Sequence, residues 1–144
     1  FRKAVYTMIQ KFLPIEMQLT YQVDGESLEQ LPNGYSDHYV PDGFERDYEQ
    51  GYDDAQAFLH VYTDIMTNDF YTVSCAIVQN QNQKELFDNE HTKYRKVKMG
   101  DVEALLGEDK NTGYYLVWED EGITHTIIGR ISIRELMLVA QKIY

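Results

Sequence analysis

The sequence predicts an α+β fold: an antiparallel, strongly twisted β-sheet of about six to eight strands, with amphipathic helices packed on it at the N- and C-terminal ends. Two features point to it. Segments with an apolar residue every three or four positions stand at both ends of the chain. Between them, strand-like segments follow one another and do not alternate with helices, which favours antiparallel pairing. The length suits a single domain spanning residues 1–144.

The first twelve residues predict the N-terminal helix, which Pro14 ends. Basic and amide residues fall on its other side. The apolar stripe consists of Phe1, Ala4, Val5, Met8, Ile9 and Phe12. From residue 16 to 23 apolar and polar residues alternate, which predicts a half-buried strand, and Asp24-Gly25 supplies a turn.

The next segment, residues 26–37, is polar and predicts a loop with a turn at Pro32-Asn33-Gly34. A second turn is predicted at Val40-Pro-Asp-Gly-Phe44. Asn68-Asp69 suits a hairpin loop, and residues 80–90 predict a connection with room for a short helix. The predicted strands lie near residues 44–50, 55–63, 70–79, 94–99, 102–106, 114–119 and 123–128.

The closing segment predicts the C-terminal helix. Ser132 and Glu135 have the spacing of a capping box, in which hydroxyl and carboxylate each accept from a free amide of the first turn. Its apolar stripe consists of Ile133, Leu136, Met137, Ala140 and Ile143.

The stretch from Leu116 to Arg130 combines the single tryptophan, three acids and a histidine, and could be a reactive site or a hairpin. Asp120-Glu121-Gly122 is typical of a hairpin tip, where acids stay hydrated. His125 alternates with Ile123 and Ile127, which predicts a packed side chain and not a ligand. We therefore expect a hairpin.

The formal charge of −11 argues against nucleic acid and against adsorption to anionic lipid. The basic run His91–Lys98 and the acidic run Asp42–Asp54 are each either a solvated face or a salt-sensitive partner site. The chain begins at Phe1, not at methionine, so we expect an excised segment whose membrane anchor lies upstream. Cys75 has no second cysteine for an internal disulfide.

Several motifs resemble the family of domains of unknown function numbered four-three-six-seven, over about Tyr39 to Tyr144. They are the Pro41-Asp-Gly-Phe44 turn, Val97–Leu105, Leu116-Val-Trp118, Glu121-Gly122, Ile127-Ile-Gly129 and Ile131–Ala140. The resemblance implies an exported C-terminal domain of a membrane-anchored protein of Gram-positive bacteria, in some members with an anti-sigma-like region. It brings no catalytic residues.

Chemical motifs are scarce. Cys75 alternates with apolar residues and is expected to be buried. The serines lie in no nucleophile elbow and the glycines form no phosphate loop. Asp37-His38 and the run Asp47–Asp54 offer oxygen ligands, but the run departs from the EF-hand pattern. His38, His60, His91 and His125 lack zinc-type spacing. We therefore predict no metal, no cofactor and no catalytic residues.

Tyrosines interleave with acids in the central loop, and tyrosine suits recognition surfaces. The candidate partner-binding residues are Tyr35, Tyr39, Tyr48, Tyr52, Asp47 and Asp53. A solvated loop is the alternative. We expect a non-catalytic extracytoplasmic binding or sensory domain that recognises a protein, a peptide or a glycan. The rivals are a hydrolase that uses Asp37, Asp42 or Asp47, and a structural assembly module.

Overall fold

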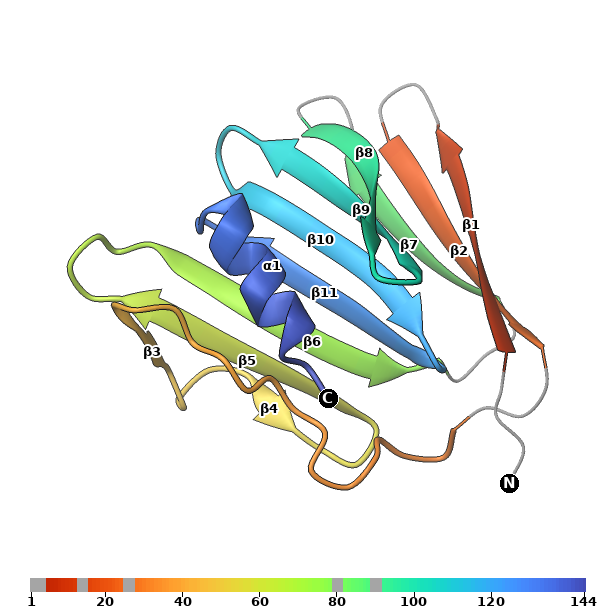
Figure 1. Ribbon diagram of the computed structural model, residues 1–144, viewed down its shortest axis with the longest axis horizontal. Helices are drawn as coiled ribbons and strands as arrows, with labels where there is room; N and C mark the ends of the chain where they lie inside the picture. Colours follow the sequence, from red (N-terminus) through yellow and green to blue (C-terminus); the bar gives the residue numbers. More distant parts are fainter. Residues whose placement is uncertain (1–4, 13–15, 25–27, 79–81, 89–91) are drawn as a thin grey trace.

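The computed structural model describes residues 5–12, 16–24, 28–78, 82–88 and 92–144, with side chains for residues 28–78 and 94–144. The described chain is mostly β, with one helix at its C-terminal end (Figure 1). The elements are β1 (Val5–Phe12), β2 (Glu16–Asp24), β3 (Phe44–Arg46), β4 (Tyr52–Asp53), β5 (Ala57–Asp64), β6 (Phe70–Ile77), β7 (Asn82–Asp88), β8 (Thr92–Met99), β9 (Val102–Asp109), β10 (Gly113–Asp120), β11 (Ile123–Gly129) and α1 (Ile133–Gln141).

The strands form two open antiparallel sheets. The larger has eight strands in the order β3-β5-β6-β11-β10-β9-β8, with β4 also paired to β5. Neighbouring strands pair from β4 to β6 and from β8 to β11, and the pairing of β6 with β11 joins these two groups into one sheet. The smaller sheet has the order β1-β2-β7 and lies at the right of the large sheet in Figure 1, where β1 contacts β10. The predicted antiparallel sheet is confirmed, and its strand number lies within the predicted range.

The predicted N-terminal helix is wrong. Residues 5–12 form β1, which pairs with β2 from Val5↔Asp24 to Phe12↔Met17. The segment VYTMIQKF is rich in β-branched and aromatic residues, which favour a strand when a partner satisfies the backbone groups. The connection predicted over residues 80–90 is also wrong where it is described, because residues 82–88 form β7 against β2. Residues 1–4, Pro14 and Gly25 lie outside the described residues, so the turn predicted at Asp24-Gly25 stays a prediction.

Most other predicted elements are confirmed. The turn at Pro32 closes with a 3.0 Å bond from the Tyr35 amide, and the turn at Pro41 closes with a 3.1 Å bond from the Phe44 amide. The strand predicted over residues 44–50 is shorter than expected and ends at Arg46. Asp47 then accepts from the Glu49 amide at 3.0 Å, which bends the chain into a turn.

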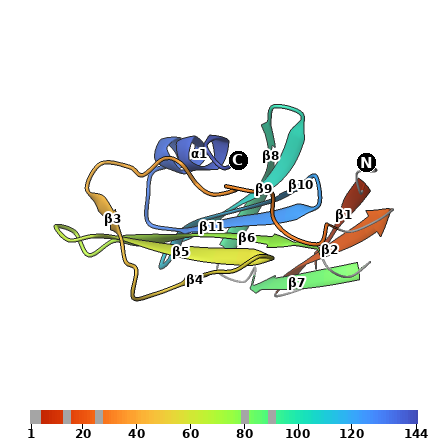
Figure 2. The same ribbon diagram turned by 90° about the horizontal axis from the view of Figure 1, so that it is seen from below.

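Helix α1 begins as predicted. The Ser132 hydroxyl accepts from the Glu135 amide at 3.1 Å. The carboxylate of Glu135 instead accepts from the Tyr39 hydroxyl at 2.8 Å, which ties the helix to the preceding loop. Figure 2 shows α1 lying across one face of the large sheet, beside the segment that leads into β3.

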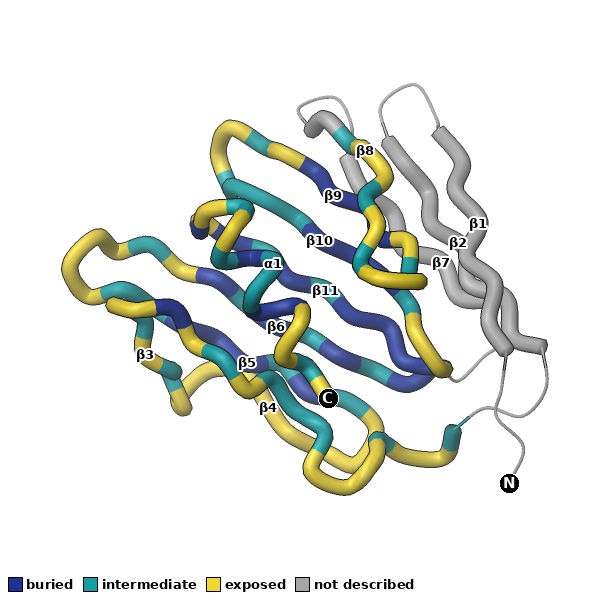
Figure 3. The backbone as a smooth tube through the Cα atoms, viewed as in Figure 1, coloured by how far each residue is buried: buried dark blue, intermediate teal, exposed yellow. Residues whose placement is uncertain are grey.

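The core lies between α1 and this face of the sheet, where the buried strand positions concentrate (Figure 3). Tyr62 and Tyr71 stack with ring centroids 4.7 Å apart, and Phe44 meets Tyr71 edge to face. The helix contributes Leu136, Val139 and Ala140 to the core.

The stretch from Leu116 to Arg130 is the predicted hairpin. Glu121 (φ 49°) and Gly122 (φ 86°) both take positive φ at the tip between β10 and β11, as a two-residue turn that matches strand twist requires. Asp120 and Glu121 are exposed, as expected. Glu119 is only half-exposed, and burial raises its pKa to about 7.

Candidate functional site

Residues 28–43 cover the helix side of the sheet and bring candidate residues over it (Figure 2). This segment is fastened to the end of the chain. Ser36 and Tyr144 exchange backbone hydrogen bonds of 3.0 and 3.1 Å, and the His38 amide donates to Lys142 at 2.8 Å. This pairing of residues 36–38 with residues 142–144 holds Tyr35 over β11 and Asp37 over β5.

Asp37 joins a cluster that we call the charge network: Arg46, Asp37, Asp53, His60 and Tyr62. His60, on β5, contacts Asp37 through Nδ1 at 2.7 Å and Asp53 through Nε2 at 2.6 Å. The Tyr62 hydroxyl donates to the other oxygen of Asp37 at 2.5 Å. Arg46 donates to Asp53 at 2.9 Å. The side chains of Asp37 and His60 are 1% and 3% exposed, whereas that of Asp53 is 60% exposed.

The positive and negative charges of the charge network balance each other. Burial opposes ionisation of Asp37, but hydrogen bonds from His60 and Tyr62 outweigh it and lower the pKa of that carboxyl. Burial also opposes protonation of His60. The hydrogen bonds of His60 to Asp37 and Asp53 outweigh the effect of burial, so the pKa of His60 is raised. Because ionised carboxylates only accept hydrogen bonds, both ring nitrogens of His60 donate and the imidazole carries a positive charge.

This geometry limits what the charge network can do chemically. A histidine acting as general base needs a free ring nitrogen within reach of a substrate proton, and both nitrogens of His60 are occupied by carboxylates. Asp37 is committed to His60 and Tyr62. The network therefore supports a structural role, in which buried opposite charges fix the loop in one position.

A cavity of about 400 Å³ lies between the C-terminal end of α1, the β8–β9 turn, the β10–β11 hairpin and the covering loop of residues 28–43. Its buried wall includes Trp118, 4% exposed, and His125, 2% exposed, whose rings stack with centroids 4.6 Å apart. Tyr35 reaches His125 Nε2 through a hydroxyl–imidazole hydrogen bond of 2.6 Å. The lining residues are Tyr35, Met99, Gly100, Val102, Trp118, Asp120, His125, Ala140, Gln141 and Ile143.

His125 brings no positive charge to this cavity at neutral pH. Burial lowers its pKa to about 4, against weaker opposing backbone interactions. Burial, followed by nearby negative groups that include Asp120 and Glu121, raises the pKa of Tyr35.

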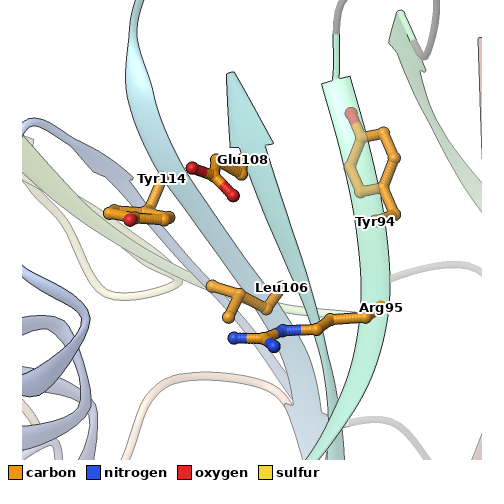
Figure 4. A pocket seen from close by; sticks show the side chains of 5 residues that line it. All are labelled: Tyr94, Arg95, Leu106, Glu108 and Tyr114. Atoms are coloured by element: carbon orange, nitrogen blue, oxygen red, sulfur yellow. The ribbon is translucent and has the colours of Figure 1, made fainter. Parts of the chain in front are cut away.

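Two further hollows adjoin the sheet. One, of about 360 Å³, lies on the other side of Tyr35, between the Pro32 turn and the Asp53–Ala55 loop. The second, of about 230 Å³, lies over β8, β9 and β10 (Figure 4). There Arg95 extends its guanidinium alongside Leu106, while Glu108 and Tyr114 lie on the β9–β10 side. Its lining carries charges of both signs, so its electrostatics favour no single ligand charge.

The six residues predicted to bind a partner do not form one patch. Tyr35 and Tyr39 pack against the core. Tyr48 is 80% exposed, with the Arg46 guanidinium 4.5 Å from its ring centre, and Tyr52 is 51% exposed on β4. Asp47 closes a turn by accepting from Gln50 at 2.7 Å. Asp53 belongs to the charge network.

The remaining candidates occupy separate settings. Asp37 is buried, Asp42 is exposed at a turn, and Asp47 holds its own turn, and among the described residues the three share no hydrogen-bond partner. Cys75 is fully buried, as predicted, and burial raises the pKa of its thiol. Among the described residues, the His, Cys, Asp and Glu side chains form no group of three arranged to hold a metal ion.

The sequence reasoning missed the charge network and the cavity. It named Asp37 as a possible oxygen ligand or hydrolase residue, but it did not predict that the Asp37 side chain is buried and only 1% exposed. Asp37 and His60 lie 23 positions apart and meet only through the fold. One signal was present: His60 alternates with Phe58 and Tyr62 along a strand, which placed an ionisable ring on the buried face.

Fold and site together define a mostly β domain with one covering helix, a buried charge network and a cavity walled by aromatic rings. The family model of the domain of unknown function DUF4367 matches residues 34–143. The chain belongs to that family, and the resemblance drawn from its motifs is confirmed. No curated protein and no solved structure was found to match the chain. In the part of the chain that is described, no helix has the length and apolar character needed to cross a membrane.

Proposed function

We propose that this domain is a non-catalytic binding or sensory domain, displayed outside the cytoplasm by a membrane-anchored protein. The observation that carries the binding role is the cavity of about 400 Å³ with Tyr35, Trp118 and His125 in its walls. Its volume falls in the range of roughly 300–1,000 Å³ that small-ligand pockets occupy, and aromatic walls with a few polar groups are typical of such pockets.

The proposed location and sensory role rest on the motifs that resemble those of exported, membrane-anchored domains. A ligand in the cavity would contact both the covering loop, through Tyr35, and the end of the chain, through Ile143. It would thereby change how firmly these two segments are held together. An upstream apolar span of roughly 20 residues in the full reading frame would support the anchored setting, and a full-length protein that fractionates away from membranes would refute it.

The single tryptophan makes the binding role testable, because Trp118 lines the cavity. Purified protein is titrated with fractions of a cell-envelope extract, while tryptophan fluorescence and the melting temperature are measured. We expect a saturable response in the wild type and in Tyr52→Ala, a matched control at an exposed tyrosine. Tyr35→Ala is expected to lose that response. Equal responses in all three proteins, or none in the wild type, would remove the cavity from the proposal.

The hydrolase alternative is less well supported, because His60 has no free ring nitrogen and Asp47 is engaged in a turn. The assembly alternative has one observation in its favour. The tip of the β5–β6 hairpin exposes Ile65 (72%) and Met66 (92%), and exposed apolar side chains of this kind can form contacts between molecules. Sedimentation that shows a stable dimer, lost in Met66→Asp, would favour assembly over ligand binding.

A further inference from the structure

The cavity over β8, β9 and β10 has an apolar floor between two opposite charges (Figure 4). Leu106, 3% exposed, forms the floor. In the strand register Arg95 on β8 stands opposite Leu106, and Glu108 on β9 stands opposite Tyr114 on β10. Because residues two apart on a strand share a face, Leu106 and Glu108 point to the same side of the sheet. The guanidinium and the carboxylate therefore line the cavity on either side of Leu106.

Both charged side chains are exposed at the rim of this cavity. Hydration leaves a guanidinium positive and a carboxylate negative at neutral pH. On the same two strands Lys96 pairs with Glu103 at 3.5 Å, whereas within the described residues no ion pair joins Arg95 to Glu108. The cavity thus presents one positive and one negative group, separated by the apolar surface of Leu106.

The two signs of charge decide which ligand the cavity suits. An anion beside Arg95 would also lie near the carboxylate of Glu108, and a cation beside Glu108 would also lie near the guanidinium. A zwitterion meets an opposite charge at both places. The volume of about 230 Å³ is smaller than the roughly 300–1,000 Å³ of most small-ligand pockets, which favours a compact molecule.

We propose that this cavity, which we call the zwitterion site, binds a free amino acid or a short peptide by its ammonium and carboxylate ends. The carboxylate lies against Arg95, whose guanidinium can donate two parallel hydrogen bonds to it, and the ammonium lies against Glu108. The apolar body rests on Leu106, beside the rings of Tyr94 and Tyr114. This inference goes beyond the function proposed above, because the zwitterion site shares no lining residue with the cavity of about 400 Å³.

The test is a titration of the full chain followed by NMR of the backbone amides, because exposed charge pairs are weak and a Kd on the order of 1 mM is expected. The probes are leucine, N-acetylleucine, which keeps only the carboxylate, and leucinamide, which keeps only the ammonium. At about pH 6.5 the α-amino group is charged. We expect leucine to bind about fivefold more tightly than either single-charge compound, with amide shifts around Arg95, Leu106 and Glu108. The dipeptide alanylleucine is a fourth probe, and the tighter of it and leucine identifies the source, a peptide or a free amino acid.

Two variants assign the two charges. Arg95→Gln removes the partner of the carboxylate, so leucine and leucinamide are expected to bind it equally. Glu108→Gln removes the partner of the ammonium, so leucine and N-acetylleucine are expected to bind it equally. Lys98→Gln on β8 and Glu45→Gln on β3 neutralise exposed charges outside the lining and are expected to keep the wild-type preference. All four positions are exposed, so all four variants are expected to keep the wild-type melting temperature.

Three results would contradict the zwitterion site. Equal binding of leucine and both single-charge compounds to the wild type would overturn the choice of a zwitterion. A preference that the Lys98 and Glu45 variants lose as fully as the Arg95 and Glu108 variants would place the ligand elsewhere. Titrations in which no probe shifts the amides of β8 and β9 would overturn the inference outright. None of these results bears on the function proposed above, whose test follows Trp118 in the other cavity.

Discussion

Removal of the buried carboxylate of the charge network is expected to cost far more stability than removal of its exposed counterpart. Asp37 and Asp53 contact the two nitrogens of the same imidazole at 2.7 and 2.6 Å, but their side chains are 1% and 60% exposed. Asp37→Asn and Asp53→Asn therefore make the same chemical change to the same partner in two different environments.

The magnitude follows from burial. Loss of one partner from a buried ion pair costs about 3–5 kcal/mol, and the lower end applies here because His60 can release its proton in response. With about 2.1 cal/mol/K per residue, the 144 residues give an unfolding entropy of roughly 0.3 kcal/mol/K, so a loss of about 3 kcal/mol lowers Tm by roughly 10 °C. Water can replace the exposed Asp53 carboxylate, so Asp53→Asn is expected to cost less than about 1 kcal/mol.

The assay is urea and thermal unfolding of both variants at pH 6 and at high pH. The raised pKa of His60 means that its charge stabilises the fold fully below the unfolded value of about 6.5, and that this contribution is lost as pH rises through the folded pKa. The cost of Asp37→Asn should therefore shrink at high pH. Equal costs for the two substitutions, or a cost for Asp37→Asn that pH leaves unchanged, would refute the reasoning.

Two further predictions concern other residues. Burial lowers the pKa of His125 to about 4, so below about pH 6.5 the unfolded chain takes up a proton that the folded chain refuses, and stability falls toward pH 4 by roughly 3 kcal/mol. Urea unfolding from pH 7.5 to 4.5 should show a shallower fall in His125→Gln, and parallel curves would contradict this. Ser132→Ala removes the acceptor of the Glu135 amide and is expected to cost about 1 kcal/mol in thermal unfolding, whereas Ser132→Asp keeps the cap; equal losses would exclude capping as the cause.

The predictions that the structure confirms concern interactions between residues close in sequence. Ser132 caps through an amide three residues away, and Glu121-Gly122 forms a turn from its own backbone preferences. The helix prediction for residues 5–12 was wrong because a short apolar pattern fits a helix and a strand equally well. Residues 5–12 form a strand because β2 pairs with them. No local pattern in β1 reveals this partner.

The arrangement of the candidate site could not be predicted from the sequence for a related reason. Tyr35 was singled out by its residue type, but its partner His125 lies 90 positions away on β11. Trp118 and His125 were both placed correctly on their strands, yet their stacking follows from the register that sets them opposite each other. Composition could suggest tyrosine-rich recognition, but only the fold shows that Tyr35 closes a cavity while Tyr48 stays in solvent.

The charge network and the cavity are connected through the covering loop. Asp37 lies two residues after Tyr35, and its buried bond to His60 fixes the loop on β5 at the point where Tyr35 turns toward β11. The same segment pairs with the end of the chain through Ser36 and Tyr144. A buried ion pair adds little stability compared with an apolar pair of similar size. It does fix the position of the loop, because a shifted loop would leave one of the two charges buried without its partner. The network therefore sets the position of Tyr35, and with it the shape of the cavity, although none of its five residues is among those that line the cavity.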